Sequence, residues 1–270
     1  MPFSLSLIIS TYNRPDALQS VLHSIAQQNV LPDEVLIADD GSDDSTAALV
    51  QKLQLPFPTK HIWQEDQGFR AASARNRAVA AATGDYLVFI DGDCLLRPNF
   101  IQQHHQLAAQ NWFVAGHRLL LSASYTQQLL AFPITTPISL LQAIQARMRG
   151  NLNRLLPLLT LPDSQWRLHR PQRWQAARTC NLGMWRDDFV RVNGFDERFN
   201  GWGYEDSDLA VRLIRAGVGC KDGRYATGVY HLWHQENDRS RERDNHQLLQ
   251  ATLNGDYTRA IIGLDQYSHA

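Results

Sequence analysis

A short acidic motif ends a continuous apolar run: residues 86–90 (YLVFI) are followed by Asp91, Gly92 and Asp93. Two carboxylates this close repel each other unless they share a cation or a proton, and a glycine between them lets the backbone approach a ligand. Mg²⁺ and Mn²⁺ typically take one or two protein carboxylates and complete their shell with water and phosphate oxygens. The motif therefore indicates a divalent metal site. The alternative is an ordinary turn at a strand end, where Asp-Gly pairs are common.

The elements that must position this motif alternate regularly along the chain. The apolar run itself fits a strand covered on both faces, as in a parallel α/β sheet. Parallel strands bring their carboxyl ends to one edge of the sheet, where ligands bind. We therefore expect four strand ends to meet around the acidic motif. The preceding expected strands lie at residues 5–10, 34–38 and 60–64, and the expected helices at 15–26, 46–53 and 71–82.

The residues after the other strands supply the parts of a nucleotide site. Ser10, Thr11 and Tyr12 offer two hydroxyls and an aromatic ring after the first strand, and Asp39 and Asp40 offer carboxylates after the second. A base can stack on Tyr12, one of the two aspartates can accept a hydrogen bond from a base or ribose, and the metal can hold a diphosphate. No P-loop and no dinucleotide-type glycine motif follows the first strand.

These residues, in this order and spacing, resemble the inverting nucleotide-sugar transferases of glycosyltransferase family 2. The resemblance covers about residues 5–98. It implies an α/β protein with the GT-A fold, in which a mainly parallel central sheet is flanked by helices and a less regular acceptor-binding lobe follows. The resemblance rests on four motifs: Ser-Thr-Tyr-Asn-Arg at 10–14, Asp-Asp-Gly-Ser at 39–42, Gly-Phe-Arg-x-x-x-x-Arg-Asn at 68–76 and Asp-x-Asp at 91–93.

The resemblance also implies roles for single residues. Asp39 would contact the base edge, Asp93 would be the main metal ligand, and Asp91 would contact the ribose or the metal. For Arg75 the alternative is a structural salt bridge to the acids of these loops. The implied nucleotide-sugar contacts are Ser10, Thr11, Tyr12, Arg14, Asp39, Arg70, Arg75, Asp91 and Gly92.

A second group of chemically capable residues lies at 193–208, where a loop rich in glycine and asparagine leads into an expected helix. Glu205, Asp206 and Asp208 fall in the first helical turn, where the helix dipole favours acids for structural reasons alone. The dipole does not account for Trp202, which is bracketed by glycines. An exposed indole beside a carboxylate is a natural platform for a sugar ring.

This segment resembles, over about residues 180–234, the Gly-Trp-Gly-x-Glu-Asp motif shared by β-1,4-galactosyltransferases and bacterial chondroitin-type polymerases. The resemblance implies a catalytic pair, with Asp206 as the general base and Glu205 beside it. Glu205 would also hold donor or acceptor sugar together with Trp202 and Gly203.

The same resemblance implies that a later histidine joins the metal. His231 directly follows a strand-like run and occupies the family's position, so we prefer it, and His234 is the alternative. The implied cofactor is Mn²⁺ or Mg²⁺, and an imidazole ligand suits the softer Mn²⁺.

The rest of the chain shows weaker patterns. A helix at 99–110 and a strand at 113–121 are expected to complete the sheet, and residues 122–175, with five prolines, predict short helices and loops. We expect one continuous GT-A domain with a nucleotide-sugar-binding half at 1–121 and a half at 122–270 that holds the acceptor and the catalytic base.

The composition bounds the class of protein. With 270 residues, 44% of them hydrophobic, the chain can form a sizeable core. No run approaches the roughly 18 apolar residues of a membrane span, and no leader pattern begins the chain, so we expect a cytoplasmic protein without a nucleic-acid partner. Cys94, Cys180 and Cys220 are isolated and odd in number, which argues against disulfides and a thiolate zinc site.

Charge is distributed unevenly. Between Cys94 and Cys180 there are nine arginines, no lysine and one acid, Asp163, so this block carries +8 and the remainder −9. One alternative to a binding surface is that the arginines form salt bridges with acids elsewhere in the chain and bury the aliphatic parts of their side chains. As a binding surface, the block would contact an anionic lipid-linked glycan at a membrane through Arg147, Arg149, Arg154, Arg167, Arg170 and Arg173.

Together these features predict an inverting, metal-dependent glycosyltransferase. It would move a hexose or N-acetylhexosamine from a UDP-sugar to a glycan acceptor in bacterial surface polysaccharide or lipopolysaccharide biosynthesis, with possible peripheral contact with the inner membrane. One alternative is a sugar-phosphate nucleotidyltransferase, which would need a glycine-rich N-terminal loop that this sequence lacks. The other is a nucleotide- or carbohydrate-binding module with weak or no catalysis.

Overall fold

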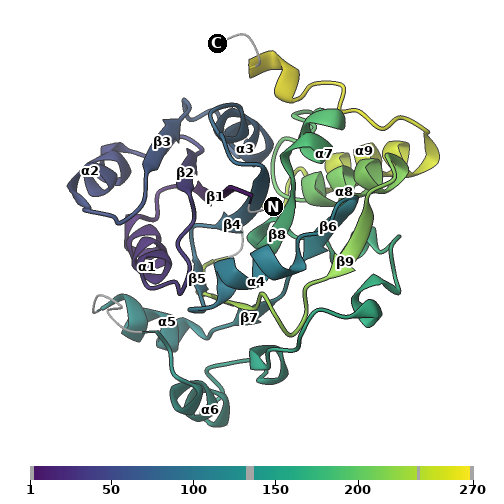
Figure 1. The fold of residues 1–270 in the computed structure, drawn as a ribbon. Helices are drawn as coiled ribbons and strands as arrows, with labels where there is room; N and C mark the ends of the chain where they lie inside the picture. The colour runs from purple at the N-terminus through teal and green to yellow at the C-terminus, as the bar shows by residue number, and fades with distance from the viewer. Residues whose placement is uncertain (1–2, 132–136, 236–237, 268–270) are drawn as a thin grey trace.

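In the computed structural model, which describes residues 3–131, 137–235 and 238–267, the strands expected before residue 92 form one side of a seven-stranded sheet (Figure 1). They pair in parallel, in the order β3-β2-β1-β4. The register places Ser10 beside Asp91 and Thr11 beside Asp39, so the strand ends share one edge as predicted. These strands are β1 (Leu5–Thr11), β2 (Glu34–Asp39), β3 (Thr59–Trp63) and β4 (Tyr86–Asp91).

Three later strands extend the sheet beyond β4. β8 (Leu182–Trp185) runs antiparallel to β4 and to β6 (Trp112–Ala115), and β9 (Gly219–Asp222) runs parallel to β6. The expected fold class is confirmed: the sheet is mainly parallel and has helices on both faces. Because strands from before and after residue 121 share it, the proposed donor and acceptor halves are built on one sheet. That division of labour stays a prediction.

The helices cover the sheet in a way that explains its continuous apolar strands. Leu7 and Ile9 of β1 pack in the core on the side of α1 and α4, whereas Ile8 packs in the core on the side of α3, α7 and α8. Alternate residues point to opposite faces, so a strand covered on both faces must be apolar throughout. The helices are α1 (Pro15–Ala26), α2 (Asp44–Lys52), α3 (Ala71–Ala80), α4 (Phe100–Leu107), α5 (Ala123–Leu130), α6 (Leu140–Met148), α7 (Arg186–Arg191), α8 (Glu205–Arg215) and α9 (Glu242–Asn254).

A smaller sheet corrects the prediction of one strand at 113–121. The chain breaks there after β6, and β7 (Arg118–Leu120) pairs instead with β10 (Val229–His231). The cause is Asn181, whose side chain donates to the carbonyls of His117 and Thr227, while a Cβ on Gly116 would lie 2.0 Å from its Oδ1. β10 also pairs antiparallel with β5 (Cys94–Leu96), so His231 lies opposite Cys94.

Residues 122–175 form short helices and loops where they are described, as predicted. One arginine of the basic block was misassigned, however. Arg167 is 1% exposed, and its guanidinium donates to five backbone carbonyls, among them those of Asp222 and Arg224 at 2.8 and 2.6 Å. It therefore cannot meet an external phosphate. Within the described residues, no helix has the length and apolarity needed to cross a bilayer.

Candidate active site

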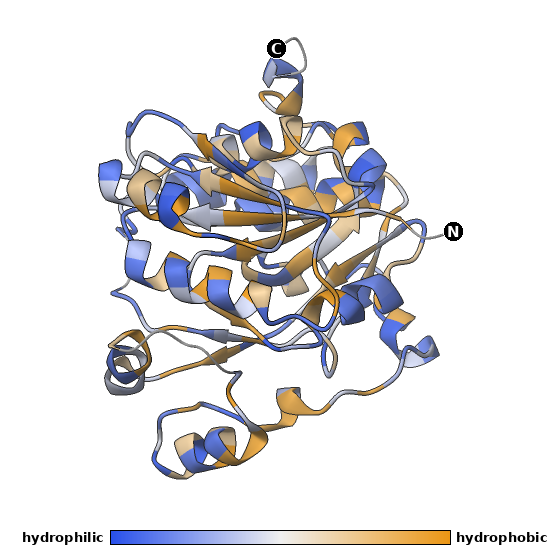
Figure 2. Cartoon of the chain, turned by 60° about the vertical axis from the view of Figure 1, so that its left-hand side comes forward, coloured by the Kyte–Doolittle hydropathy of each residue, from blue (hydrophilic) through white to orange (hydrophobic). Residues whose placement is uncertain are grey.

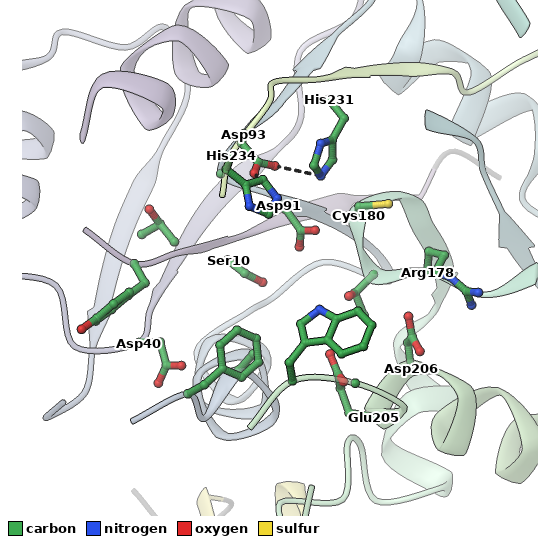
Figure 3. A pocket seen from close by; sticks show the side chains of 18 of the residues that line it. Ser10, Asp40, Asp91, Asp93, Arg178, Cys180, Glu205, Asp206, His231 and His234 are labelled. Carbon is green, nitrogen blue, oxygen red and sulfur yellow. Dashed lines mark ion pairs between the residues drawn. The ribbon is translucent and has the colours of Figure 1, made fainter. Parts of the chain in front are cut away.

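A cavity of about 920 Å³ opens where the carboxyl ends of β1 and β4 meet the start of α8 and the end of β10 (Figure 3). Most of the residues singled out in the sequence line it, although they come from segments more than 200 residues apart. Those lining residues are Ser10, Thr11, Tyr12, Arg14, Arg75, Asp91, Gly92, Asp93, Trp202, Gly203, Glu205, Asp206, His231 and His234.

Gly92 fixes the acidic motif against β1. Its backbone N–H donates to the Ser10 carbonyl at 2.7 Å, and an added Cβ would lie 3.0 Å from that oxygen and 3.2 Å from the Thr11 side chain. Only a residue without a side chain fits this contact unstrained. The glycine thus lets the Asp91 and Asp93 carboxylates project from a backbone held tightly to its neighbour.

Asp91, Asp93, Cys94 and His231 bring potential ligand atoms within 4.8 Å of one another, close enough to share one metal ion. Burial raises the pKa of Asp91; Arg75 opposes this rise and the Asp93 carboxylate adds to it. A divalent cation would relieve that repulsion, and two carboxylates with an imidazole are a donor set that Mn²⁺ or Mg²⁺ can use. The Cys94 thiol is fully buried, and burial raises its pKa well above the usual range, so it stays protonated.

The two candidate histidines both approach the motif. His231 Nε2 lies 3.5 Å from one Asp93 carboxylate oxygen, and His234 Nε2 lies 3.5 Å from the other. Figure 3 shows the three side chains grouped on one side of the pocket. His231 also belongs to the cluster that contains Asp91, which favours it as the ligand.

Arg75 links three of the elements that build the site. Its side chain is 4% exposed and donates to Ser10 Oγ at 2.8 Å, to Glu205 Oε1 at 3.0 Å and to Asp91 Oδ1 at 3.4 Å. Burial opposes its charge, but the Glu205 and Asp91 carboxylates outweigh this and raise its pKa. The salt bridge considered for Arg75 in the sequence is therefore present, and the guanidinium also lines the pocket.

The three acids at the start of α8 have different surroundings. Asp208 is fully buried and is bound by Arg212 at 2.7 Å and by the Thr252 hydroxyl at 2.6 Å. Glu205 is engaged by Arg75. Asp206 lines the cavity, and loss of solvent there, followed by the charge of Glu205, raises its pKa to about 6. Asp206 is thus the acid of this turn best suited to exchange a proton near neutral pH.

The backbone before α8 is bent to present these acids. Gly203 has a φ of +106° and Tyr204, the residue at the helix N-cap, has a φ of +73°. A non-glycine residue in the left-handed region costs roughly 1–2 kcal/mol, so surrounding packing must hold it there. Nearby, the Arg239 guanidinium lies 4.5 Å from the centre of the Trp202 ring.

At the base end of the pocket, the two aspartates at the end of β2 have different surroundings, and the contact of Asp39 with the base stays a prediction. Asp40 lines the cavity and accepts from the backbone N–H of Arg70 at 2.6 Å. Asp39 is fully buried beside the lining and bonds His61 and Ser42, which lower its pKa although burial opposes this. The Arg70 side chain turns to the Glu65 carbonyl.

Several lining residues were missed in the sequence, including Arg118, Arg178, Thr179 and Trp233. They belong to no motif and reach the pocket only through the smaller sheet and through the segment before β8. The one available signal was the arginine-rich block, which contains Arg118 and Arg178 but does not indicate which of its arginines face the site.

Comparison with known proteins identifies the family. Residues 6–141 match the family described as glycosyl transferase family 2, and residues 164–235 match the N-terminal domain of galactosyltransferase. A validoxylamine A glucosyltransferase of Streptomyces hygroscopicus subsp. limoneus is 32% identical over 240 residues, which cover 83% of this chain and 51% of that protein. A chondroitin synthase of Escherichia coli is 27% identical over 79% of this chain and 32% of its own length. The chain thus spans about half of the first relative's length and about a third of the second's.

Two solved structures share the fold. A mannosyltransferase from Pyrobaculum calidifontis in complex with GDP-Man and Mn²⁺ superimposes with a TM-score of 0.60 at 16% identity, over 93% of this chain and 63% of that one. S. aureus TarS 1-349 in complex with UDP superimposes with a TM-score of 0.60 at 15% identity, over 98% of this chain and 68% of the TarS chain. With residues 6–141 matched by the family model, this chain belongs to glycosyltransferase family 2.

Proposed function

We propose that the enzyme transfers a hexose or N-acetylhexosamine from a UDP-sugar to a hydroxyl of a glycan or lipid-linked glycan, with inversion and with a divalent metal. The observation that carries the proposal is the pairing of two groups in one cavity: a carboxylate–imidazole cluster, and a carboxylate whose pKa is about 6. Figure 3 shows Asp93 and His231 across the pocket from Asp206. We assign the reaction to bacterial surface polysaccharide or lipopolysaccharide synthesis at the cytoplasmic face of the membrane.

The donor would lie along the β1, β2 and β4 ends. Tyr12 offers its ring to the base and Asp40 offers a carboxylate acceptor. Asp39 is buried behind the cavity lining and would order the loop after β2 by accepting a hydrogen bond from the Ser42 backbone N–H. A metal held by Asp91, Asp93 and His231 would neutralise charge on the diphosphate oxygens. These positions leave the sugar near the centre of the cavity, towards Trp202 and α8.

The chemical step follows from the acids of α8. Asp206 accepts the proton of the acceptor hydroxyl as that oxygen bonds to the anomeric carbon. The bond from that carbon to the diphosphate oxygen breaks, and its electron pair leaves with UDP. Attack opposite the leaving group inverts the configuration in one displacement, so no covalent enzyme intermediate is needed. Glu205 does not compete for the proton because Arg75 binds it.

The acceptor would lie over the loop before α8. Trp202 lines the pocket and offers an apolar ring face, as sugar-binding aromatic residues do. Arg118, whose charge acts on Asp91, and Arg178, whose charge acts on Asp206, line the same cavity, so cations face both the metal side and the acceptor side. This favours an acceptor that carries negative charge, in keeping with a phosphate- or carboxylate-bearing glycan.

The test is nucleotide release by the purified chain. UDP-glucose, UDP-galactose and their N-acetyl forms are incubated with Mn²⁺, with Mg²⁺ or with EDTA, and GDP-mannose serves as the alternative donor. We expect metal-dependent UDP release from at least one UDP-sugar, lost in Asp206→Asn and retained in Asp187→Asn, whose carboxylate is exposed at the start of α7.

Other outcomes correct particular parts of the proposal. Release from GDP-mannose alone would correct the donor and leave the transferase assignment intact. Equal release in EDTA would contradict the metal assignment. Pyrophosphate release from UTP and a sugar phosphate would favour the nucleotidyltransferase alternative, and tight UDP-sugar binding without any release would favour a binding module.

A further inference from the structure

Large apolar side chains gather on one outer arm of the molecule, which we define as residues 140–161 and call the α6 arm. Seven of the sixteen large hydrophobic side chains that are exposed among the described residues lie on it. Leu140, Leu141 and Met148 are 65%, 64% and 82% exposed. The others are Ile144, Leu156, Leu159 and Leu161. Such a concentration on an outer surface marks an interaction site.

The orientation of α6 is the reverse of that of an ordinary surface helix. Its small residues, Ala143 and Ala146, face inwards and pack in the core, while Leu140, Ile144 and Met148 recur four residues apart on the solvent side. A helix stabilised only by its own domain would bury its leucines. The outward stripe is therefore built to contact something beyond the described chain.

The arm is fixed to the domain, not a loose appendage. Ser139 forms a capping box with Gln142 at the start of α6, and Leu152 is buried and bridges Leu121 at the end of the smaller sheet. Figure 1 shows α6 at the lower edge of the molecule, away from the seven-stranded sheet. In Figure 2 the lowest segment, turned by 60°, again lies at the edge and carries hydrophobic stretches.

The charged residues of the arm are all arginines, which favours an anionic partner. Residues 122–162 contain no aspartate or glutamate, and their charged residues are Arg147, Arg149 and Arg154, all exposed. Arg147 lies beside the apolar stripe of α6, and Arg149 follows the helix at its C-cap. Exposed leucines on an arm whose own charged residues are all arginines match the interface of an anionic bilayer, where apolar side chains enter the acyl boundary and arginines meet lipid phosphates. The nearest acid along the chain, Asp163, lies just past the arm and binds Lys221 at 2.7 Å.

We propose that the α6 arm docks on an anionic lipid bilayer. The stripe of Leu140, Leu141, Ile144 and Met148 enters the headgroup region, and Arg147 and Arg149 bind lipid phosphates. The arm joins the catalytic cavity directly, because Leu121 lines the cavity and pairs with Leu152. Docking would therefore hold the acceptor side of the pocket close to the membrane surface. The inference deepens the membrane location given in the proposed function, but it does not depend on the identity of the donor or the acceptor, so vesicle binding and nucleotide release can fail independently.

The test is co-sedimentation of the full chain with phosphatidylcholine vesicles, with and without phosphatidylglycerol, at low and high salt. We expect binding to the anionic vesicles that weakens as salt rises. Arg147→Gln with Arg149→Gln should weaken it by about 30-fold, or about fivefold for each arginine. Leu140→Ser with Leu141→Ser should weaken it by roughly 10- to 100-fold.

Matched controls keep this test decisive. Arg243→Gln and Ile261→Ser remove an exposed arginine and an exposed isoleucine elsewhere, and they should bind vesicles like the wild type. The melting temperature of each variant checks that it is folded. If the double leucine variant does not fold, the double arginine variant alone tests the proposal. Absence of wild-type binding to anionic vesicles at low salt would overturn the proposal. So would lipid-independent dimers that the leucine variant dissociates, because the stripe would then bind a second copy.

Discussion

Asp206 differs from its two acidic neighbours in what its carboxylate meets. Asp208 is bound by Arg212 and Thr252, and Glu205 is bound by Arg75, whereas Asp206 faces the cavity. Sequence alone could place three acids in one helical turn, but it could not separate them, because the partners that distinguish them lie 4 to 130 residues away.

Asp206→Asn should remove the base and little else. Asparagine keeps the size and most hydrogen bonds of the side chain but cannot take a proton, so kcat should fall by roughly 10² to 10⁴. The donor Kd, measured by calorimetry, should change little. Asp187→Asn is the control, because it makes the same chemical change on an exposed helix start. Near-normal turnover in Asp206→Asn would remove this residue from the base assignment.

The acid limb of the pH profile should report the same group. The base works only when ionised, and the pKa of Asp206 is raised to about 6, so kcat/KM should be level above that pH. Below it, protonation should lower kcat/KM by about tenfold per pH unit. Initial rates from pH 4.5 to 8 at saturating metal would show this. An acid limb centred near pH 4 would indicate a carboxyl in ordinary solvent and contradict the assignment.

At the scale of elements, Arg75 of α3 holds together the ends of β1 and β4 and the start of α8. Each of these elements carries residues of the proposed site. The geometry of the pocket therefore depends on one buried cation with three acceptors.

Arg75→Gln should be strongly destabilising because it leaves Glu205 and Asp91 without their buried counter-ion. The expected loss is about 3–5 kcal/mol in the free energy of unfolding, measured in urea. Arg75→Lys should lose less, because it keeps the charge but not the fork of donors. Arg77→Gln, an exposed neighbour whose guanidinium lies 5.0 Å from the Tyr267 ring, should cost about 1 kcal/mol at most. Equal losses at positions 75 and 77 would contradict the role given to Arg75.

The elements also show what sequence pattern can and cannot predict. The early strands and helices were predicted to within a few residues because apolar periodicity and turn residues are local signals. The prediction of one strand at 113–121 was wrong because the break in that strand depends on Asn181, which lies more than 60 residues later in the sequence. The prediction that Arg167 contacts an anionic partner was wrong for the same reason, because its carbonyl partners at Asp222 and Arg224 are more than 50 residues away in the sequence.

At the scale of the whole molecule, one arrangement serves binding and chemistry. The first half of the chain supplies the acidic motif, and the second supplies Asp206 and His231. The two meet because β8 and β9 extend the sheet while β10 joins β5. The motifs predicted this meeting through family resemblance, since no local pattern connects His231 with Asp93 across more than 130 residues.

Because the proposed metal ligands Asp91, Asp93 and His231 come from both halves of the chain, ligand binding there should stabilise the whole fold. With Mn²⁺ and UDP together at about 100 times their Kd, the gain should be about 2.7 kcal/mol, which is a rise of roughly 5–10 °C in melting temperature for a chain of this size. UDP with EDTA should give little of this rise, and Asp93→Ala should abolish the part that needs Mn²⁺. Asp187→Ala, outside the cavity, should show the full rise. If Asp93→Ala gave the same metal-dependent rise as the wild type, Mn²⁺ would have to bind elsewhere, because the carboxylate at position 93 contacts both candidate histidines and is central to the cluster.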